Sequence, residues 1–246
     1  AIGGNYYDTI QTLSETQDRG CIVGGYFQSD TIQIEDNVLE NHSDKSQSPE
    51  GFAIKYSYNG EVQWAKSING DSSDYVECIT TSNDGGYILG GYTTSKTIQI
   101  DNKMLANNES ALSFLMKYNI NGEIEWTKQI TGTQRTSIIS ISNTKDNGVI
   151  VGVNGGYYAI RIDEIEVTRK GETDLIIKID KDGNVETTQT IGDLKTLYSI
   201  IEIDNNSYII TGYGGTGTQL GGNYYITETS EYFMAKIEQK ELNNPL

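Results

Sequence analysis

Histidine is almost missing from this chain of 246 residues, and that scarcity excludes several kinds of catalytic site. The single histidine, His42, lies in a polar stretch between expected strands, so no second histidine is present to build a zinc site, and the sequence shows no arrangement typical of a catalytic triad. The motifs GxSxG and HExxH and the P-loop signature are also missing. We therefore expect a protein that is not an enzyme, with no catalytic residues and no cofactor.

Basic side chains are scarce as well. The sequence has 18 Lys and Arg against 34 Asp and Glu, which gives a net charge of −16. Phosphate binding needs a basic face, so this charge argues against a nucleic-acid partner. No apolar run approaches the roughly 18 residues of a membrane span, and we expect no membrane insertion. We interpret the acidic residues as a solubilising surface charge, with Ca²⁺ binding by some aspartates as the alternative.

Cysteine is limited to Cys21 and Cys78, whose spacing matches no CxxC or other metal motif. Both lie in expected strands, where a thiol is usually a small buried hydrophobic group. A disulfide between them stays open, and the cysteines leave the cellular compartment undecided.

Glycine and tyrosine are plentiful, with 27 and 17 residues, and the glycines recur in a pattern. The stretch DGGYILGGY (84–92) has echoes along the chain, which align Gly24, Gly90, Gly152 and Gly212. A second marker is a lysine after an apolar triplet, at Lys55, Lys117, Lys178 and Lys236. A third marker is an isoleucine followed closely by glycine, at Ile2, Ile68, Ile130 and Ile191. The chain therefore consists of four repeats of about 60 residues.

Each repeat is expected to contain four antiparallel strands. In the second repeat, DYVECITTS and YILGGYT flank the turn sequence NDGG, and SFLMKYN and EIEWTKQI flank NING. The latter turn holds Asn-Gly or Asp-Gly in three repeats, which predicts a tight two-residue connection. A variable stretch separates the two hairpins. No segment shows a sustained helical period, so helix is expected to be essentially absent.

Four antiparallel strands repeated in this way predict an all-β fold, namely a β-propeller. The pattern W-A-K-x-I-x-G, followed by DGGYILGGY and FLMKYNINGEIEW, resembles the repeats of secreted bacterial β-propeller proteins, the seven-bladed β-propeller repeat family and its relatives. NGEIEW is also similar to the tryptophan-docking turn of quinoprotein dehydrogenase propellers. The third repeat departs from the pattern, with Thr187 where Trp64 and Trp126 stand in the first two. The resemblance covers nearly the whole chain and implies a secreted or cell-surface protein, most relatives of which carry no assigned activity.

We predict a single β-propeller domain over residues 1–246, with blades at approximately 4–70, 71–132, 133–192 and 193–246. The AIGG start matches the end of a fourth strand, and the last blade lacks a complete strand after EYFMAKIEQKEL. In a closed four-bladed ring, one of the two termini would complete the last blade. The alternative is part of a larger propeller with more blades, joined to other domains of a longer polypeptide.

Two motifs suggest chemistry that their surroundings do not support. GYGGTG (212–217) satisfies the GxGxxG pattern of dinucleotide sites, but the sequence after it cannot open a helix. DKDGN (180–184) resembles the start of a calcium loop, but it occupies the place of a hairpin turn in the other repeats. Paired carboxylates of a glycosidase cannot be identified among so many acidic residues.

Tyrosines in the parts that do not repeat are the candidate ligand-binding residues. They are Tyr157 and Tyr158 in NGGYYAI, and Tyr224 and Tyr225 in GGNYYIT. Variable segments on a repeat scaffold are the usual place for binding, whereas Tyr26, Tyr87, Tyr92 and Tyr208 recur in strands and are expected to pack. We expect an extracellular binding or adhesion module for a glycan or protein partner. The alternatives are a structural spacer of a larger surface protein and, less favoured, a quinoprotein-like or glycoside-active enzyme.

Overall fold

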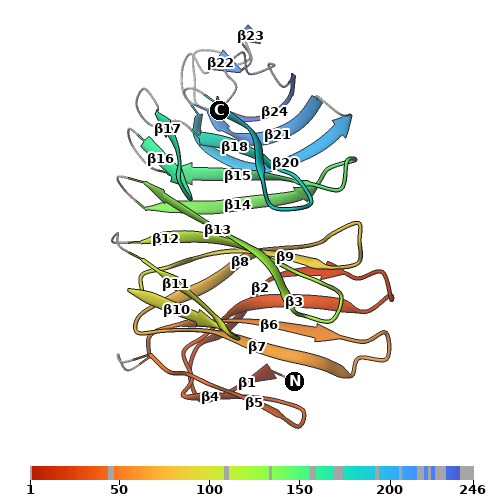
Figure 1. The fold of residues 1–246 in the computed structure, drawn as a ribbon, viewed down its shortest axis with the longest axis vertical. Coiled ribbons are helices and arrows are strands. Elements are labelled where there is room, and N and C mark those ends of the chain that lie inside the picture. Colours follow the sequence, from red (N-terminus) through yellow and green to blue (C-terminus); the bar gives the residue numbers. More distant parts are fainter. Residues whose placement is uncertain are drawn as a thin grey trace. The chain divides into compact units, whose positions relative to one another are not determined.

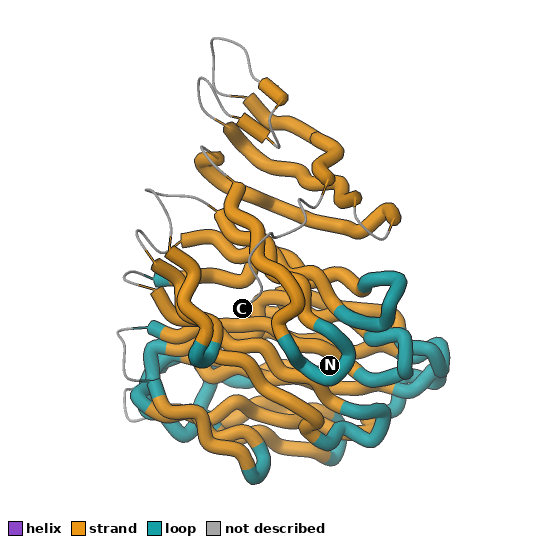
Figure 2. Tube along the Cα trace, turned by 45° about the horizontal axis from the view of Figure 1, so that its top comes forward, coloured by secondary structure: helices purple, strands orange, loops and turns teal. Residues whose placement is uncertain are grey.

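The computed structural model describes residues 2–43, 47–107, 111–132, 135–155, 159–168, 174–191, 194–204, 207–214, 219–220, 223–224 and 231–238. Every regular element within these residues is a β-strand and none is a helix (Figures 1 and 2). The all-β prediction is therefore confirmed.

The strands recur in sets, which we call the first to the fourth repeat. The first repeat contains β2 (Asp8–Glu15), β3 (Cys21–Phe27), β4 (Thr31–Ile34), β5 (Asn37–Glu40), β6 (Glu50–Tyr56) and β7 (Val62–Gly70), after β1 (Ile2–Gly3). The second contains β8 (Asp74–Thr81), β9 (Tyr87–Thr93), β10 (Thr97–Ile100), β11 (Lys103–Ala106), β12 (Leu112–Tyr118) and β13 (Ile124–Gly132). The third contains β14 (Thr136–Asn143), β15 (Val149–Gly155), β16 (Ala159–Ile162), β17 (Ile165–Thr168), β18 (Asp174–Ile179) and β19 (Val185–Ile191). The fourth contains β20 (Leu194–Asp204), β21 (Ser207–Gly214), β22 (Gln219–Leu220), β23 (Asn223–Tyr224) and β24 (Glu231–Glu238).

Each of the first three repeats has an antiparallel meander of four strands, as in β2-β3-β6-β7, and the fourth has the three-stranded sheet β20-β21-β24. None of these sheets closes on itself within the described residues. The chain divides into two compact units, which are residues 1–81 with 85–129, and residues 82–84 with 130–246.

The stretch predicted to be variable is a short hairpin in each of the first three repeats, and it pairs outside its own meander. β4 pairs with β1, β10 pairs with the end of β7, and β16 pairs with Ile130–Gly132 of β13. Each hairpin has a two-residue loop that begins with an acidic residue in the left-handed region, at Glu35, Asp101 and Asp163. The identical letters TIQI in β4 and β10 are a sequence signal for this hairpin.

The turn between the first two strands is tied to a buried lysine of the third meander strand. In the first repeat Thr16 Oγ1 donates to Asp18 Oδ1, and Lys55 Nζ donates to Asp18 Oδ2 at 2.9 Å. These hydrogen bonds, from Thr16 and then from Lys55, lower the pKa of Asp18 to about 2. The same positions recur in the third repeat as Thr144, Asp146 and Lys178. In the first and third repeats the lysine marker thus reflects an ion pair that holds the turn to the sheet, whereas Lys236 of the fourth repeat is exposed.

The second turn is longer than the predicted two-residue connection, so that prediction is wrong. Tyr56 pairs with Val62, and Ser57 N donates to Glu61 O at 2.8 Å, which makes a five-residue connection. Gly60 takes a φ of 82° there, a value that favours glycine. DKDGN (180–184) forms the same turn, because Asp180 N donates to Asn184 O. Its interpretation as a turn is therefore confirmed.

A β-bulge lies in the first strand of every repeat, opposite the recurring glycines. In β2 the register skips Gln11, between the positions that face Gly25 and Gly24, and the first strands of the other repeats have the same step. A Cβ on Gly25 would lie 2.0 Å from Thr9 O of the bulged strand, so glycine is required at this close approach. Val153 stands at the equivalent position of the third repeat.

The bulge corrects one alignment made from the sequence. In the fourth repeat, Gly212 occupies the position of Gly25 and Gly91, whereas Thr211 occupies the position of Gly24. The predicted alignment of Gly212 with Gly24 is therefore wrong by one residue. The spacing of glycines along the sequence cannot show where the partner strand carries its extra bulge residue, and that residue decides the register.

Each unit has its own apolar core. In unit 1, side chains from β3, β6, β8, β9 and β12 pack together, including the completely buried Phe114 and Leu89. A second cluster there lies under the β4–β5 hairpin and includes Phe27 and Phe52. In unit 2, side chains from β15, β18, β20, β21 and β24 form the core. The strand tyrosines Tyr87, Tyr92 and Tyr208 are buried, as predicted, and Tyr26 is half-buried.

Trp64 of the first repeat packs against the second repeat. A Cβ on Gly122 would lie 3.1 Å from Trp64 Nε1, and the Trp64 and Tyr87 ring centroids are 5.8 Å apart. The tryptophan of one repeat therefore covers the glycine turn of the next.

Candidate functional site

The four tyrosines predicted to bind a ligand are not placed by the structure. Tyr157, Tyr158 and Tyr225 lie outside the described residues. Tyr224 lies in β23 and pairs with Gln219 of β22, but its side chain is not described. Their role in binding stays a prediction.

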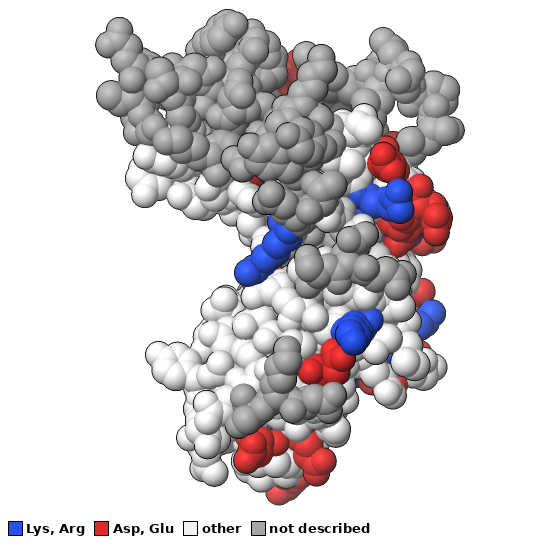
Figure 3. Space-filling view, turned by 90° about the vertical axis from the view of Figure 1, so that its left-hand side faces the viewer, with Lys and Arg blue, Asp and Glu red and all other residues white. Residues whose placement is uncertain are grey.

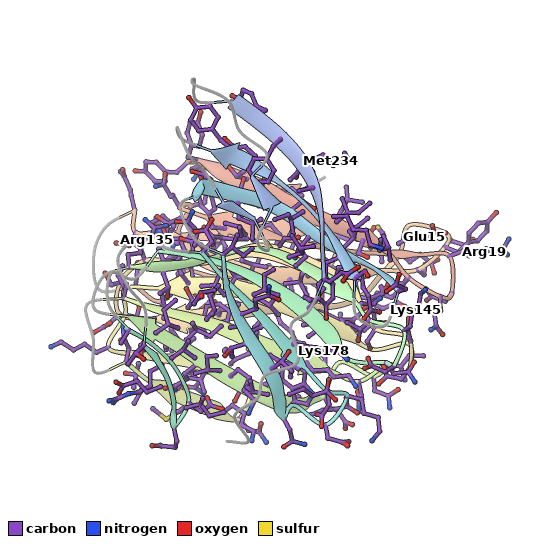
Figure 4. All side chains as sticks on the ribbon, turned by 90° about the horizontal axis from the view of Figure 1, so that it is seen from above. Glu15, Arg19, Arg135, Lys145, Lys178 and Met234 are labelled. Atoms are coloured by element: carbon purple, nitrogen blue, oxygen red, sulfur yellow. The ribbon has the colours of Figure 1, made fainter. Side chains whose placement is uncertain are left out.

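Three other tyrosines gather on the sheet of the fourth repeat, one from each strand, and we call them with Met234 the tyrosine surface. The ring centroids of Tyr198 and Tyr232 are 6.1 Å apart and the rings are stacked. Those of Tyr213 and Tyr232 are 5.2 Å apart. Tyr232 is 78% exposed and Met234 is 73% exposed. Figure 4 labels Met234 on β24.

The register of the sheet explains why these rings share one face. Tyr213 lies directly opposite Tyr232 in the β21–β24 pair, and opposite residues point to the same side. Tyr198 is the extra residue of the β20 bulge, between Leu197 and Ser199, and a bulge re-aims the side chain that it carries. On the other side of the sheet, core residues are buried. The sheet therefore carries apolar side chains on both faces, and on one face they are exposed.

Two residues of the tyrosine surface, Tyr232 and Met234, differ from the residues at the equivalent positions of the other repeats, whereas Tyr213 stands where Tyr26 and Tyr92 do. Tyr232 stands where these have small or acidic residues, at Gly51, Ser113 and Asp174. Met234 stands where they have aliphatic residues, at Ala53, Leu115 and Ile176. All six of those residues are buried. Sequence reasoning missed this surface because the bulge decides which way Tyr198 points, although the large Tyr232 at a position of small side chains was a visible signal.

A second cluster, in unit 1, consists of two completely buried carboxyls, Glu50 and Asp74. Burial raises the pKa of each to about 7. His42 N donates to Glu50 Oε2 at 2.5 Å, and the hydroxyls of Thr93 and Ser95 donate to Asp74. Since neither carboxyl is exposed, no substrate can reach the pair in this arrangement. The two carboxyls are instead expected to take up protons as the pH falls through about 7.

The remaining reactive groups offer little chemistry. Cys21 and Cys78 do not form a disulfide, and burial raises the pKa of Cys78 to about 12, which makes it a poor nucleophile. Within the described residues, no group of three His, Cys, Asp or Glu side chains is arranged to hold a metal ion. The described part of the molecule contains no helix long and apolar enough to cross a membrane.

Acidic side chains gather in several groups on the face drawn in Figure 3, and the described residues form no broad basic surface there. Many lysines are already paired with acids, as Lys55 is with Asp18.

No protein-family model and no curated protein matches the sequence. Among solved structures, a protein of unknown function from Bacteroides caccae aligns with 86% of this chain and 73% of its own, at 8% sequence identity and a TM-score of 0.41. A TM-score at this level is too low to support a functional argument.

Proposed function

We propose that the chain is a non-catalytic extracellular binding module, at the cell surface or secreted, and that the tyrosine surface contacts its partner. The observation that carries the proposal is the exposed ring of Tyr232, which stacks with the exposed ring of Tyr198 and stands at a position that is small or acidic in the other repeats. Exposed aromatic side chains gathered on one face mark interaction sites.

A glycan is the ligand that this chemistry favours over a protein. A pyranose ring presents C–H groups on its faces, which stack on aromatic rings, and hydroxyls at its rim, which hydrogen-bond to phenol groups. Tyr198 and Tyr232 supply stacked rings, and Met234 adds a flexible apolar contact beside them. The surface is therefore suited to a sugar chain lying along the sheet.

For the architecture, we propose a β-propeller with four repeats, or a part of a larger one. The support is that, within each unit, two successive repeats stack sheet on sheet with the same contacts. Thr12 Oγ1 accepts from Ile79 N of the second repeat at 3.1 Å, and Ser140 Oγ accepts from Ile200 N of the fourth at 3.2 Å. These recurring contacts also favour a second candidate function, a structural spacer in a larger surface protein.

The binding proposal is tested with a glycan array, followed by calorimetric titration of any sugar that binds. We expect Tyr232→Ala to weaken binding about tenfold or more, because it removes the central ring of the surface. Tyr7→Ala is the matched control, since Tyr7 is 74% exposed and lies in the first repeat's unit. It should change the affinity less than about twofold, and circular dichroism should show both variants folded.

Two results would contradict this proposal. One is the lack of any binding glycan, and the other is equal weakening by Tyr232→Ala and Tyr7→Ala. Binding of a protein but no glycan, still dependent on Tyr232, would keep the surface and replace the ligand class.

A further inference from the structure

Inside each unit, the first strand of one repeat presents two aliphatic side chains to the repeat before it. In the second repeat these are Val76 and Ile79 on β8, and in the fourth they are Leu197 and Ile200 on β20. All four are buried. They form the contact between stacked sheets.

The receiving strand carries a glycine at the point of closest approach. A Cβ on Gly24 would lie 2.7 Å from Val76 Cγ1, and a Cβ on Gly152 would lie 2.9 Å from Leu197 Cδ2. A side chain at either position would have to displace Val76 or Leu197, and a branched one such as valine would crowd the contact further. The contact therefore joins an aliphatic pair to a glycine-bearing sheet.

The first repeat has the same aliphatic pair, but here the described residues place no sheet over it. Ile10 and Leu13, which we call the β2 face, hold the positions of Val76 and Ile79 relative to the bulge. They are 50% and 68% exposed. Two aliphatic side chains at interface positions, left in solvent, indicate a surface made for another sheet.

The strand pairing beside the β2 face points to the same occupant. Gly3 of β1 pairs with Gln33 of β4 in the way that Asn69 of β7 pairs with Gln99 of β10, so Ile2 stands at the position of Ile68. β7 is the outer strand of the sheet that covers β8. β1 therefore lies where the outer strand of a sheet covering β2 would end.

We propose that the β2 face binds a further sheet of this same repeat type, with glycine at the position of Gly24 and its outer strand in line with β1. The fourth repeat does not meet this requirement, because the branched Thr211 takes the position of Gly24 and Met234 takes that of Ala53. A second copy of the chain does not meet it either, since Gly24, Gly90 and Gly152 are already buried. The proposal concerns a different repeat from the tyrosine surface and does not depend on it.

An extended chain supplies the missing sheet. Ile2 and Ile68 are equivalent, so residues 1–67 are joined directly before Ile2 of the full chain, which places an added first repeat in line with β1. Hydrogen exchange read by mass spectrometry then follows the β2 amides of the original copy. We expect their exchange to slow at least tenfold in the extended chain relative to the 246-residue chain.

Variants identify the contact. Leu13→Asp in the original copy should abolish the slowing in the extended chain and change little in the 246-residue chain, where Leu13 is exposed. Gly24→Val in the added copy should abolish it too. Val38→Asp in the original copy is the control, because Val38 is 50% exposed on β5, as Ile10 is on β2. It should leave the slowing intact.

Three results would overturn the proposal. The first is unchanged exchange of the β2 amides in the extended chain. An added copy that stays unstructured counts as this result, because residues 1–67 fold in the 246-residue chain with the β2 face uncovered. The second is an equal effect of Leu13→Asp in both chains. The third is dimerisation of the 246-residue chain that Leu13→Asp abolishes, since a second copy would then be the occupant.

Discussion

At the scale of single residues, the buried pair Glu50 and Asp74 makes the stability of the protein depend on pH. Burial raises the pKa of Glu50 from 4.5 to about 7 and that of Asp74 from 3.8 to about 7. Between about pH 4 and 7 the folded protein therefore binds more protons than the unfolded chain. The free energy of unfolding should fall as the pH rises through this range, and level off above it.

We expect a fall of about 5 kcal/mol between pH 5 and pH 8, about half from each carboxyl, and we expect Glu50→Gln combined with Asp74→Asn to remove most of it. Urea unfolding is the measurement, followed by the fluorescence of Trp64 and Trp126, the two tryptophans of the chain. Asp182→Asn is a suitable control, because Asp182 is exposed. Equal urea midpoints for the wild-type protein at the two pH values would contradict the prediction.

At the scale of strands and turns, the bulge sets a strict limit on side-chain size. A Cβ on Gly91 would lie 2.0 Å from Tyr75 O, whereas a Cβ on Gly3 would meet nothing within 4 Å. We expect Gly91→Ala to lower the free energy of unfolding by about 1–3 kcal/mol, because the two strands must separate. Gly3→Ala should be close to neutral, and urea unfolding of both variants compares them. Equal stability of the two variants would show that the bulge absorbs the methyl group.

Elements of this kind could be predicted where a local pattern determines them. Turn residues and alternating apolar residues indicated the meander strands, because a hairpin needs only neighbouring residues. What a local pattern does not give is the attachment of the β10–β11 hairpin, because β10 bonds to β7 of the preceding repeat, a pairing remote in sequence. The bulge residue Tyr198 could not be assigned to a face for a similar reason, since its direction depends on the partner strand.

At the scale of the whole molecule, the net charge of −16 opposes folding through repulsion among acidic residues. Salt screens exposed charges, with a Debye length of roughly 30 Å at 0.01 M and 10 Å at 0.1 M. In the ion pairs Lys55–Asp18 and Lys178–Asp146, the two charged groups of each pair are in direct contact and the lysine is largely buried, so salt screens these attractions less. As salt is added, the repulsion among exposed acidic residues should therefore weaken before the attraction within these ion pairs does.

We expect the melting temperature at pH 7 to rise by a few degrees between about 10 and 300 mM NaCl. Near pH 4.4, the isoelectric point of the sequence, the rise should vanish, because little net charge is left to screen. A titration with CaCl₂ at equal ionic strength separates screening from binding. If the melting temperature rises more than with NaCl and the rise saturates with concentration, Ca²⁺ binding is established, because a ligand of the folded state stabilises it by mass action. Melting temperatures that fall with NaCl at pH 7 would mean that exposed ion pairs outweigh the repulsion.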